Sequence, residues 1–309
     1  MNPKVSVIVP VYNGEDTIST MVDSLLNQTL RDIEILIIDD GSTDKTPDIL
    51  DSYSKKDKRI RVFHKVNEGV AMARQLGVNK AIADYSIHAD ADDWVENNML
   101  EEMYNLAIKE DADILIADYY NDFKSGKTYY KKQNIKSLKS SDILKGILQG
   151  RLFGGLCHKL VRHSLYKEYN VSFFKDINYC EDVLVCAQLL KNDGVKVSYL
   201  PKAFYHYIQN DASITHHISR KSFEGLLKYK AKLNEVLDNQ DYSSSLKSVE
   251  LMIFHEGFCS PGVMSSREIK EYFKAIENEA FKTPSLRWKV GYYCVKLGLF
   301  RMARLLLNY

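Results

Sequence analysis

Two hydrophobic periods alternate along the first 118 residues, and this alternation limits the chain to few folds. Four short aliphatic runs have the length and composition of buried strands, namely Val5–Val9, Ile33–Ile38, Ile60–Phe63 and Tyr85–His88. The segments between them place apolar residues on one helix face, as in the series Ile18, Met21, Val22, Leu25 and Leu26. Strands that alternate with helices in this way predict a mostly parallel sheet covered by helices, which is an α/β fold.

The bulk composition excludes several classes of protein. At 309 residues the chain can form one large domain or two modest ones, and its net charge of +1 gives no electrostatic reason to bind nucleic acid. Five scattered cysteines without a C-x-x-C pair favour reduced thiols. A strand-like run begins directly after Lys4, which leaves no room for a signal peptide, and no apolar stretch approaches the ~18 residues that cross a bilayer. We therefore expect a cytoplasmic protein that does not span the membrane.

Polar residues follow each predicted strand. Tyr12-Asn13, Asp39-Asp40, Asn67 and the triplet Asp90-x-Asp92-Asp93 all fall where a strand ends. In open α/β sheets, ligands gather at the carboxyl ends of the strands. Crowded carboxylates repel one another and attract hard cations such as Mg²⁺ or Mn²⁺, which typically also bind substrate phosphates. The triplet therefore favours a metal–diphosphate site, although alone it would be read as an acidic surface turn.

Five motifs in a fixed order carry a resemblance to a known family. They are Val9-Pro10-Val11-Tyr12-Asn13, Asp39-Asp40-Gly41-Ser42-x-Asp44, Asn67-x-Gly69 with Ala73-Arg74, Asp90-x-Asp92-Asp93, and Glu181-Asp182. Together, over residues 4 to 215, they resemble the family 2 glycosyltransferases of the GT-A fold. The resemblance implies a mostly parallel, Rossmann-like central sheet flanked by helices, with a nucleotide-sugar-binding half (1–120) and an acceptor-binding half (121–218). The last third carries no such resemblance, and its own sequence pattern predicts a helical C-terminal region (219–309).

The resemblance gives roles to residues that follow the first two strands. Pro10, Tyr12 and Asn13 line the nucleotide pocket, where the ring of Tyr12 can pack against the base. Asp40 accepts the N3–H of uracil, although guanine also offers ring N–H donors. The alternative interpretation of both segments is structural, because Pro-x-Tyr-Asn-Gly and Asp-Asp-Gly are also turns that begin helices.

A third motif precedes the third helix. By resemblance, Asn67, Gly69 and Arg74 lie near the diphosphate or the donor sugar, bound through Arg74 or through backbone N–H groups. The alternative is that Asn67 is the N-cap of a helix from Asn67 to Ala81 and that Arg74 is a surface arginine.

The resemblance assigns the chemistry to two acidic motifs. Asp92 ligates the divalent metal, and Asp90 holds the ribose or the donor sugar. Asp182 is the catalytic base, with Glu181 as the second candidate. The alternative for this last pair is structural, because acidic residues in the first turn of a helix are stabilised by its dipole.

The chain departs from the family pattern at two places. Tyr205-His206-Tyr207 and the following Asp211–Thr215 resemble a loop that closes over the donor, but Ile208 stands where an arginine is usual; we consider His206, His216 and Lys159 as substitutes. Processive relatives carry Q-x-x-R-W, whereas here Pro284 precedes Arg287-Trp288. We therefore expect a non-processive enzyme.

Two further segments are unusual in charge. Phe123–Tyr130 has the turn residues of a hairpin, and residues 124–139 carry six lysines, which we interpret as a solvated sheet edge.

Residues 286–309 are predicted to form one cationic helix with an apolar stripe of Trp288, Tyr292, Val295, Leu299, Met302 and Leu306. Such a helix can lie on an anionic membrane, or dock on the body or on the second copy of a homodimer.

We therefore expect an inverting, metal-dependent glycosyltransferase. It would move one hexosyl or N-acetylhexosaminyl group from a nucleotide-diphosphate donor, a UDP-sugar by preference, to a saccharide or lipid-linked saccharide acceptor in cell-surface polysaccharide synthesis. A sugar nucleotidyltransferase or a Rossmann dehydrogenase would need a glycine-rich loop after the first strand, which is missing. The alternative from another class is a catalytically silent scaffold or sugar-binding subunit.

Overall fold

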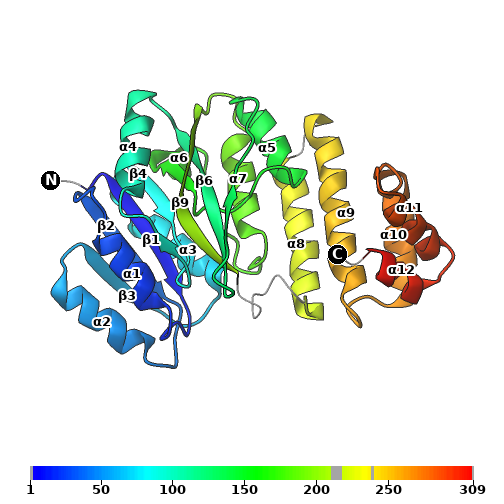
Figure 1. The fold of residues 1–309 in the computed structure, drawn as a ribbon, viewed down its shortest axis with the longest axis horizontal. Coiled ribbons are helices and arrows are strands. Elements are labelled where there is room, and N and C mark those ends of the chain that lie inside the picture. Colours follow the sequence, from blue (N-terminus) through cyan, green and yellow to red (C-terminus); the bar gives the residue numbers. More distant parts are fainter. Residues whose placement is uncertain (1–2, 210–217, 238–239, 308–309) are drawn as a thin grey trace. The chain divides into compact units, whose positions relative to one another are not determined.

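The computed structural model describes residues 3–209, 218–237 and 240–307. The chain divides into two compact units, Met1–Asn210 and Asp211–Tyr309, and each is described by itself. Figure 1 shows the strands in the first unit and the long helices of the second.

The described part of the first unit alternates strands and helices as the sequence predicts. Its elements are β1 (Val5–Val11), α1 (Ile18–Leu26), β2 (Ile33–Asp39), α2 (Thr46–Lys56), β3 (Ile60–His64), α3 (Val70–Lys80), β4 (Tyr85–His88), β5 (Trp94–Val95), α4 (Met99–Lys109), β6 (Ile114–Phe123), β7 (Thr128–Lys131), α5 (Ser140–Leu148), β8 (Lys159–Arg162), α6 (Ser164–Glu168), α7 (Glu181–Leu190) and β9 (Val197–Gln209).

The strands form one sheet in the order β3-β2-β1-β4-β8-β6-β9-β5, with β7 added to β6 as a hairpin. The long pairings are parallel: β1 with β2 and β4, β2 with β3, and β6 with β9. The short strands β5, β7 and β8 run antiparallel to their neighbours. This arrangement confirms the predicted α/β fold with a mostly parallel sheet.

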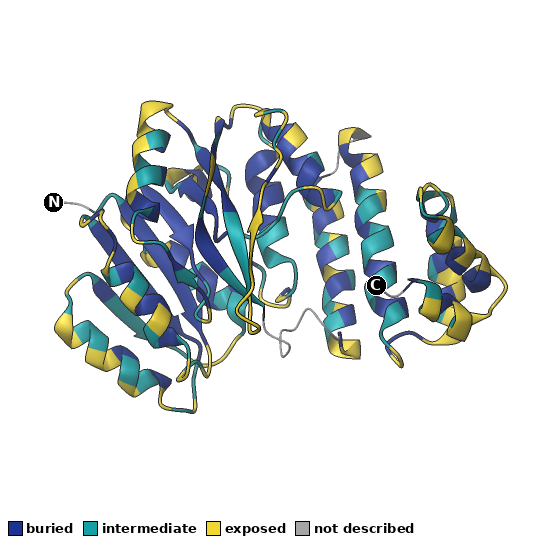
Figure 2. Cartoon of the chain, in the orientation of Figure 1, coloured by how far each residue is buried: buried dark blue, intermediate teal, exposed yellow. Residues whose placement is uncertain are grey.

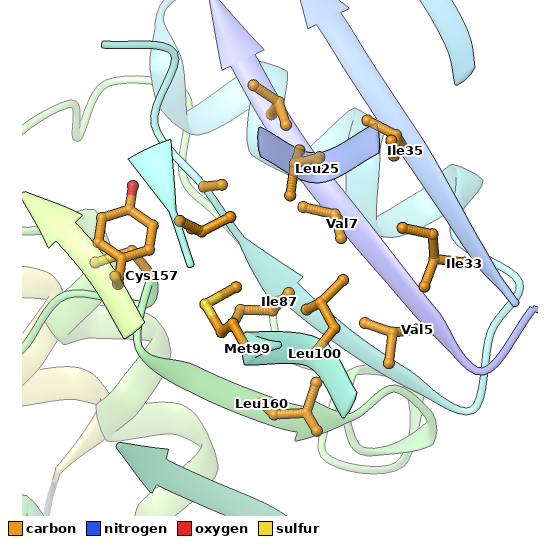
Figure 3. Packing of buried hydrophobic residues seen from close by; sticks show 14 of the residues in the cluster. Val5, Val7, Leu25, Ile33, Ile35, Ile87, Met99, Leu100, Cys157 and Leu160 are labelled. Carbon is orange, nitrogen blue, oxygen red and sulfur yellow. The ribbon is translucent and has the colours of Figure 1, made fainter. Parts of the chain in front are cut away.

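The two faces of β1 pack against different helices. Val5 and Val7 belong to a buried cluster that includes Leu25 of α1 and Leu100 of α4, as Figure 3 shows. On the opposite face α3 comes so close that a Cβ added at Gly77 would lie 2.3 Å from Ile8 Cγ2. The absence of a side chain at Gly77 therefore permits close packing of α3 on the sheet.

Parallel alignment brings the carboxyl ends of β1, β2 and β4 to one edge. Asp40 N–H donates to the carbonyl of Val11 (2.8 Å), and Ala89 N–H donates to the carbonyl of Ile8 (2.9 Å). The polar residues that follow these three strands are thereby collected at the same edge of the sheet.

The second unit is helical. Its described elements are α8 (Arg220–Val236), η1 (Gln240–Tyr242), α9 (Ser243–Cys259), α10 (Ser266–Ala280), α11 (Leu286–Lys296) and α12 (Phe300–Leu307). Helix α10 begins with a capping box, in which Ser265 and Glu268 satisfy each other's backbone N–H groups. The core of the second unit contains the buried rings of Phe254, Phe258, Phe273 and Tyr292. The predicted helical C-terminal region is therefore confirmed.

The single helix expected over 286–309 is wrong. Gly298, with φ +77°, ends α11 in a Schellman motif: its N–H donates to Val295 O, and Leu299 N–H donates to Cys294 O. The predicted stripe is divided between two helices, so that Tyr292 and Val295 are buried while Leu299 and Met302 are about half exposed. None of the described helices is long and apolar enough to cross a membrane.

Candidate active site

The end of β1 leads into a tight loop held by Asn13. Asn13 adopts φ +50°; its Oδ1 accepts the N–H of Thr43 (2.8 Å), and its own N–H donates to Ser42 Oγ (2.9 Å). Pro10 is buried within β1, whereas Tyr12 directly after the strand is 53% exposed. The ring of Tyr12 is therefore accessible to a ligand on a rigid turn.

Asp40 is buried and anchors the loop that precedes α3. Its Oδ1 accepts Lys65 Nζ (2.6 Å) and Glu68 N–H (3.0 Å), and its Oδ2 accepts Gly69 N–H (2.7 Å). Each carboxylate oxygen thus already has a protein partner, and Oδ2, with one, keeps a lone pair for a further donor. Asp40 and Gly69, which are 29 residues apart in sequence, meet at one place.

The start of α3 differs from the expected N-cap at Asn67. The cap position is Gly69, and Asn67 is an exposed residue of the preceding loop. Gly69 has φ +94°, and a Cβ there would lie 2.5 Å from the amide of Asn178, whose Oδ1 accepts Ala71 N–H (3.1 Å). The helix is therefore capped by a residue from a distant segment, and only glycine fits beneath it.

Arg74 joins three carboxylates from distant segments. Its guanidinium donates to Asp90 Oδ1 (2.7 Å), to Asp182 Oδ1 (2.6 Å) and to Glu181 in a very short contact. The Arg74 side chain is only 6% exposed, so the surface-arginine interpretation is wrong. In sequence, Asp90 lies 16 residues from Arg74 and Asp182 lies 108, so the fold alone brings these residues together.

The acidic triplet after β4 contains three carboxylates in different environments. Asp93 is buried and accepts Tyr205 O–H (2.6 Å) and Ile208 N–H (2.8 Å), which ties the end of β9 to the triplet. Asp90 is partly exposed, and its N–H donates to Tyr205 Oη (2.9 Å). Asp92 is exposed. Of the three, Asp92 is therefore the carboxylate most accessible to a ligand.

The electrostatics of the cluster favour additional positive charge. Desolvation of its carboxylate by the surrounding protein and the charge of Asp90 raise the pKa of Asp92. Burial raises the pKa of Glu181 to about 7, although Arg74 opposes this, and burial likewise raises the pKa of Asp182. Burial would lower the pKa of Arg74, but the charges of Asp182, Asp90 and Glu181 hold it well above its usual value. The site contains more carboxylates than one arginine can neutralise.

Two substitutes considered for the missing loop arginine are already engaged. Lys159 is buried and donates to the carbonyls of Phe153 (2.8 Å) and Gly155 (2.6 Å). His206 is stacked on Trp94 with ring centroids 3.6 Å apart. The third, His216, and the loop Asp211–Thr215 lie outside the described residues. Neither Lys159 nor His206 is therefore free to replace an arginine at Ile208.

Three contributions to the site were not predicted from the sequence. Asn178 caps α3, Tyr205 holds both Asp90 and Asp93, and Leu156 N–H donates to Asp182 Oδ2 (3.2 Å). Tyr205 belongs to the Tyr-His-Tyr motif, which lies in β9 rather than in the loop that the resemblance implies. The other two leave no local signal, because a single asparagine and a backbone N–H are common everywhere.

The donor chemistry of the cluster suits a hard cation that is completed by substrate. No group of three or more His, Cys, Asp or Glu residues in the described ranges is arranged to hold a metal ion. Mg²⁺ and Mn²⁺ sites that act on nucleotides often use one or two carboxylates together with phosphate oxygens. The exposed Asp92, with its raised pKa, fits such a site.

Comparisons with known proteins show the family of the chain. The sequence model described as "Glycosyl transferase family 2" matches residues 6–170. The chain is 30% identical over 283 residues to the putative glycosyltransferase EpsH of Bacillus subtilis, covering 89% of this chain and 82% of EpsH.

Solved structures show the same fold. S. aureus TarS 1–349 in complex with UDP-GlcNAc gives a TM-score of 0.71 at 19% identity, covering 99% of this chain and 90% of that chain. The mannosyltransferase PcManGT from Pyrobaculum calidifontis, in complex with GDP-Man and Mn²⁺, gives 0.57 at 14% identity, covering 100% and 87%. The fold is therefore of the GT-A type, and the chain belongs to glycosyltransferase family 2.

Proposed function

We propose that this glycosyltransferase moves one sugar from a nucleotide-diphosphate donor to a hydroxyl group, with inversion and with the help of a divalent metal. The observation that carries the proposal is the junction at Arg74, where Asp90 of the acidic triplet and the pair Glu181-Asp182 meet. Arg74 thereby holds the proposed base, Asp182, close to Asp90, which is proposed to bind the donor.

Asp182 is the proposed base. Arg74 and Leu156 N–H hold its carboxylate in place, and its raised pKa brings it closer to neutrality, where a general base works best. Asp182 would remove the proton of the acceptor hydroxyl as this oxygen attacks the anomeric carbon from the side opposite the diphosphate. One displacement inverts the centre, so an α-linked donor would give a β-linked product.

Asp92 is the proposed metal ligand. When bound, a divalent ion would neutralise the negative charge on the leaving diphosphate. Asp90, oriented by Arg74 and by Tyr205, would bind hydroxyl groups of the ribose or of the donor sugar. The pyrophosphate would complete the coordination that Asp92 alone cannot supply.

The base of the donor is proposed to be uracil. Asp40 is buried, its backbone N–H donates to the carbonyl of Val11, the residue before the exposed Tyr12, and its Oδ2 has one donor. A carboxylate is a good acceptor for the uracil N3–H. Two TarS structures are complexes, one with UDP and one with UDP-GlcNAc, whereas the PcManGT structure is a complex with GDP-Man and Mn²⁺. The proposed acceptor is a saccharide or a lipid-linked saccharide of the cell surface.

Removal of metal should abolish turnover. We expect one of a panel of UDP-, GDP- and TDP-sugars to stabilise the purified chain thermally with Mn²⁺, and to release its nucleoside diphosphate. EDTA should remove the release and excess Mn²⁺ should restore it, measured by a coupled nucleotide assay. A chain that gains no thermal stability and shows no turnover with any donor would instead support a silent scaffold.

We further propose that α11 and α12 contact an anionic membrane surface. Exposed apolar residues recur on these helices and on the turn between them, with basic residues between them in sequence: Leu286, Val290, Tyr293, Leu297 and Leu305. These residues are not the ones of the predicted stripe, of which Tyr292 and Val295 are buried. A second copy of the chain could cover the same apolar face, which would form a homodimer.

Vesicle flotation distinguishes contact with a membrane from contact with a second copy of the chain. The full chain should float with vesicles that contain phosphatidylglycerol, and a chain ending at Glu279 should not. Neutral phosphatidylcholine vesicles are the control for electrostatic attraction. Equal flotation of both chains would refute membrane contact through this region, and a dimer that is lost on truncation would favour the second copy.

A further inference from the structure

The hairpin β6–β7 presents an exposed sheet edge beside the active site. Every residue of β7 is exposed, and Figure 2 shows this strand in yellow next to β6. We propose that this hairpin binds the acceptor and that the acceptor is an anionic saccharide. This inference rests on the proposed function, because it names the substrate class of the same site.

One face of the hairpin continues into the acidic cluster. Asn121 of β6 pairs with Tyr129 of β7 on one side and with Tyr207 of β9 on the other, so these three side chains share a face. Burial and the charges of Asp90 and Asp93 raise the pKa of Tyr207, as expected for a ring beside the triplet. The row Tyr207, Asn121, Tyr129 therefore runs from the proposed donor site to the sheet edge.

This face offers the groups that bind sugars. Phe123 and Tyr129 are 41% and 50% exposed, with ring centroids 5.5 Å apart in an edge-to-face arrangement. Between the rings of Tyr129 and Tyr207, the side-chain oxygen of Asn121 is buried without a hydrogen-bond partner among the described residues. Aromatic faces can stack on sugar rings, and a buried amide oxygen without a partner gains from a hydroxyl donor.

The hairpin and the segment after it are strongly cationic. Exposed lysines lie in the hairpin at Lys124, Lys127 and Lys131 and after it at Lys132, Lys136 and Lys139, and no ion pair to any of them occurs in the described ranges. No acidic residue stands between Phe123 and Lys139, although the chain as a whole has a net charge of only +1. Lys127 and Lys131 lie on the face of Tyr129, about 13 Å apart along the strand. The charge is complementary to carboxylate or phosphate groups along a polymer.

An anionic membrane would also attract lysines, but the accompanying groups favour a saccharide. Membrane-surface segments insert aliphatic and aromatic side chains as one apolar face. Here the rings alternate with lysines and with the buried side-chain oxygen of Asn121, and the row leads to the carboxylates that would perform the transfer. Continuity with the catalytic cluster therefore favours the acceptor over a membrane.

Affinity electrophoresis of the full chain tests this proposal. Native gels would contain hyaluronan as an anionic polysaccharide, dextran as a neutral one, or no polymer. The double variant Lys127→Glu/Lys131→Glu is compared with Lys55→Glu/Lys58→Glu, which changes the net charge equally at exposed lysines of α2 and the residues after it. The thermal shift given by UDP with Mn²⁺ is measured for each chain, and this reports on folding and on the donor site.

We expect hyaluronan to retard the wild type and the α2 variant, and to bind the hairpin variant about tenfold more weakly, since reversing two lysines loses about 1.4 kcal/mol. The proposal would be overturned if both variants lost hyaluronan affinity equally, or if dextran retarded the wild type as much as hyaluronan does. It would also be overturned if phosphatidylglycerol vesicles bound the wild type and the α2 variant but not the hairpin variant. If the hairpin variant shows a normal thermal shift with UDP and unchanged hyaluronan binding, the role of the hairpin is refuted but the proposed function is not. A wild type without any nucleotide shift refutes the proposed function itself.

Discussion

Replacing Arg74 by methionine should lower the free energy of unfolding of the first unit by about 3–5 kcal/mol, because three carboxylates lose their common buried partner. Only two tryptophans are present, Trp94 in the first unit and Trp288 in the second. In a Trp288→Phe background, Trp94 fluorescence during urea unfolding reports on the first unit alone.

The loss at Arg74 should depend on pH. The pKa of Glu181 in the folded state is raised from 4.5 to about 7, so this group favours folding below its unfolded pKa and loses that contribution as pH rises through about 7. Without Arg74 the folded-state pKa values of Glu181 and Asp182 should rise further. The variant should therefore lose more stability at about pH 8 than at about pH 5.5.

Arg162 provides the matched control. It also pairs with two carboxylates, Asp111 and Asp113, but its side chain is 29% exposed and that of Asp111 is 67% exposed. Arg162→Met should cost about 1 kcal/mol or less, because water screens exposed pairs. An equal cost for the two arginines, or no pH dependence for Arg74→Met, would contradict the account of a buried charged junction.

Asp182→Asn should reduce sugar transfer by about 10²–10⁴-fold, which is the usual contribution of a positioned general base. Asparagine keeps the shape of the side chain, but its single carbonyl oxygen can accept a hydrogen bond from Arg74 or from Leu156 N–H and not from both. Because Asp182 is not a proposed contact of the nucleotide or of the metal, the affinity for UDP with Mn²⁺ should change little. Initial rates at saturating donor measure the first effect, and calorimetry measures the second.

Two comparisons make this test specific. Burial raises the pKa of Asp182, so wild-type kcat/KM should fall on the acid side and the residual activity of Asp182→Asn should lack this limb. Glu181→Gln should retain more activity than Asp182→Asn. The opposite order would transfer the role of base to Glu181, and full activity in both variants would remove the base from this pair.

The parallel half of the fold could be predicted because each of its strands and helices has a recognisable pattern within its own segment of sequence. Strands β1, β2, β3 and β4 are short aliphatic runs bounded by turn residues, and their ends carried the acidic and amide side chains. The break at Gly298 also had a local signal, a glycine after a lysine in the last turn, but the apolar stripe that runs past it suggested a continuous helix.

The site could be predicted as a set of residues but not as an arrangement. The resemblance pointed to Asp90, Asp182 and Arg74 separately, yet only the fold puts Arg74 between them. The cap of α3 by Asn178, 107 residues away from Ala71, has no counterpart in local patterns. Such pairings depend on tertiary packing, and composition, period and spacing within a segment carry no information about them.

The most direct test of the account is calorimetric titration of UDP into the wild type and into Asp92→Asn, each with Mn²⁺ and with EDTA. The account predicts that Mn²⁺ strengthens UDP binding by about tenfold or more in the wild type, since one added charge contact of about 1.4 kcal/mol has that effect, and that it has no effect in the variant. The claim that Asp92 brings a divalent ion to the diphosphate would be contradicted if Mn²⁺ strengthened UDP binding equally in both proteins. It would also be contradicted if Mn²⁺ did not change the UDP affinity of the wild type.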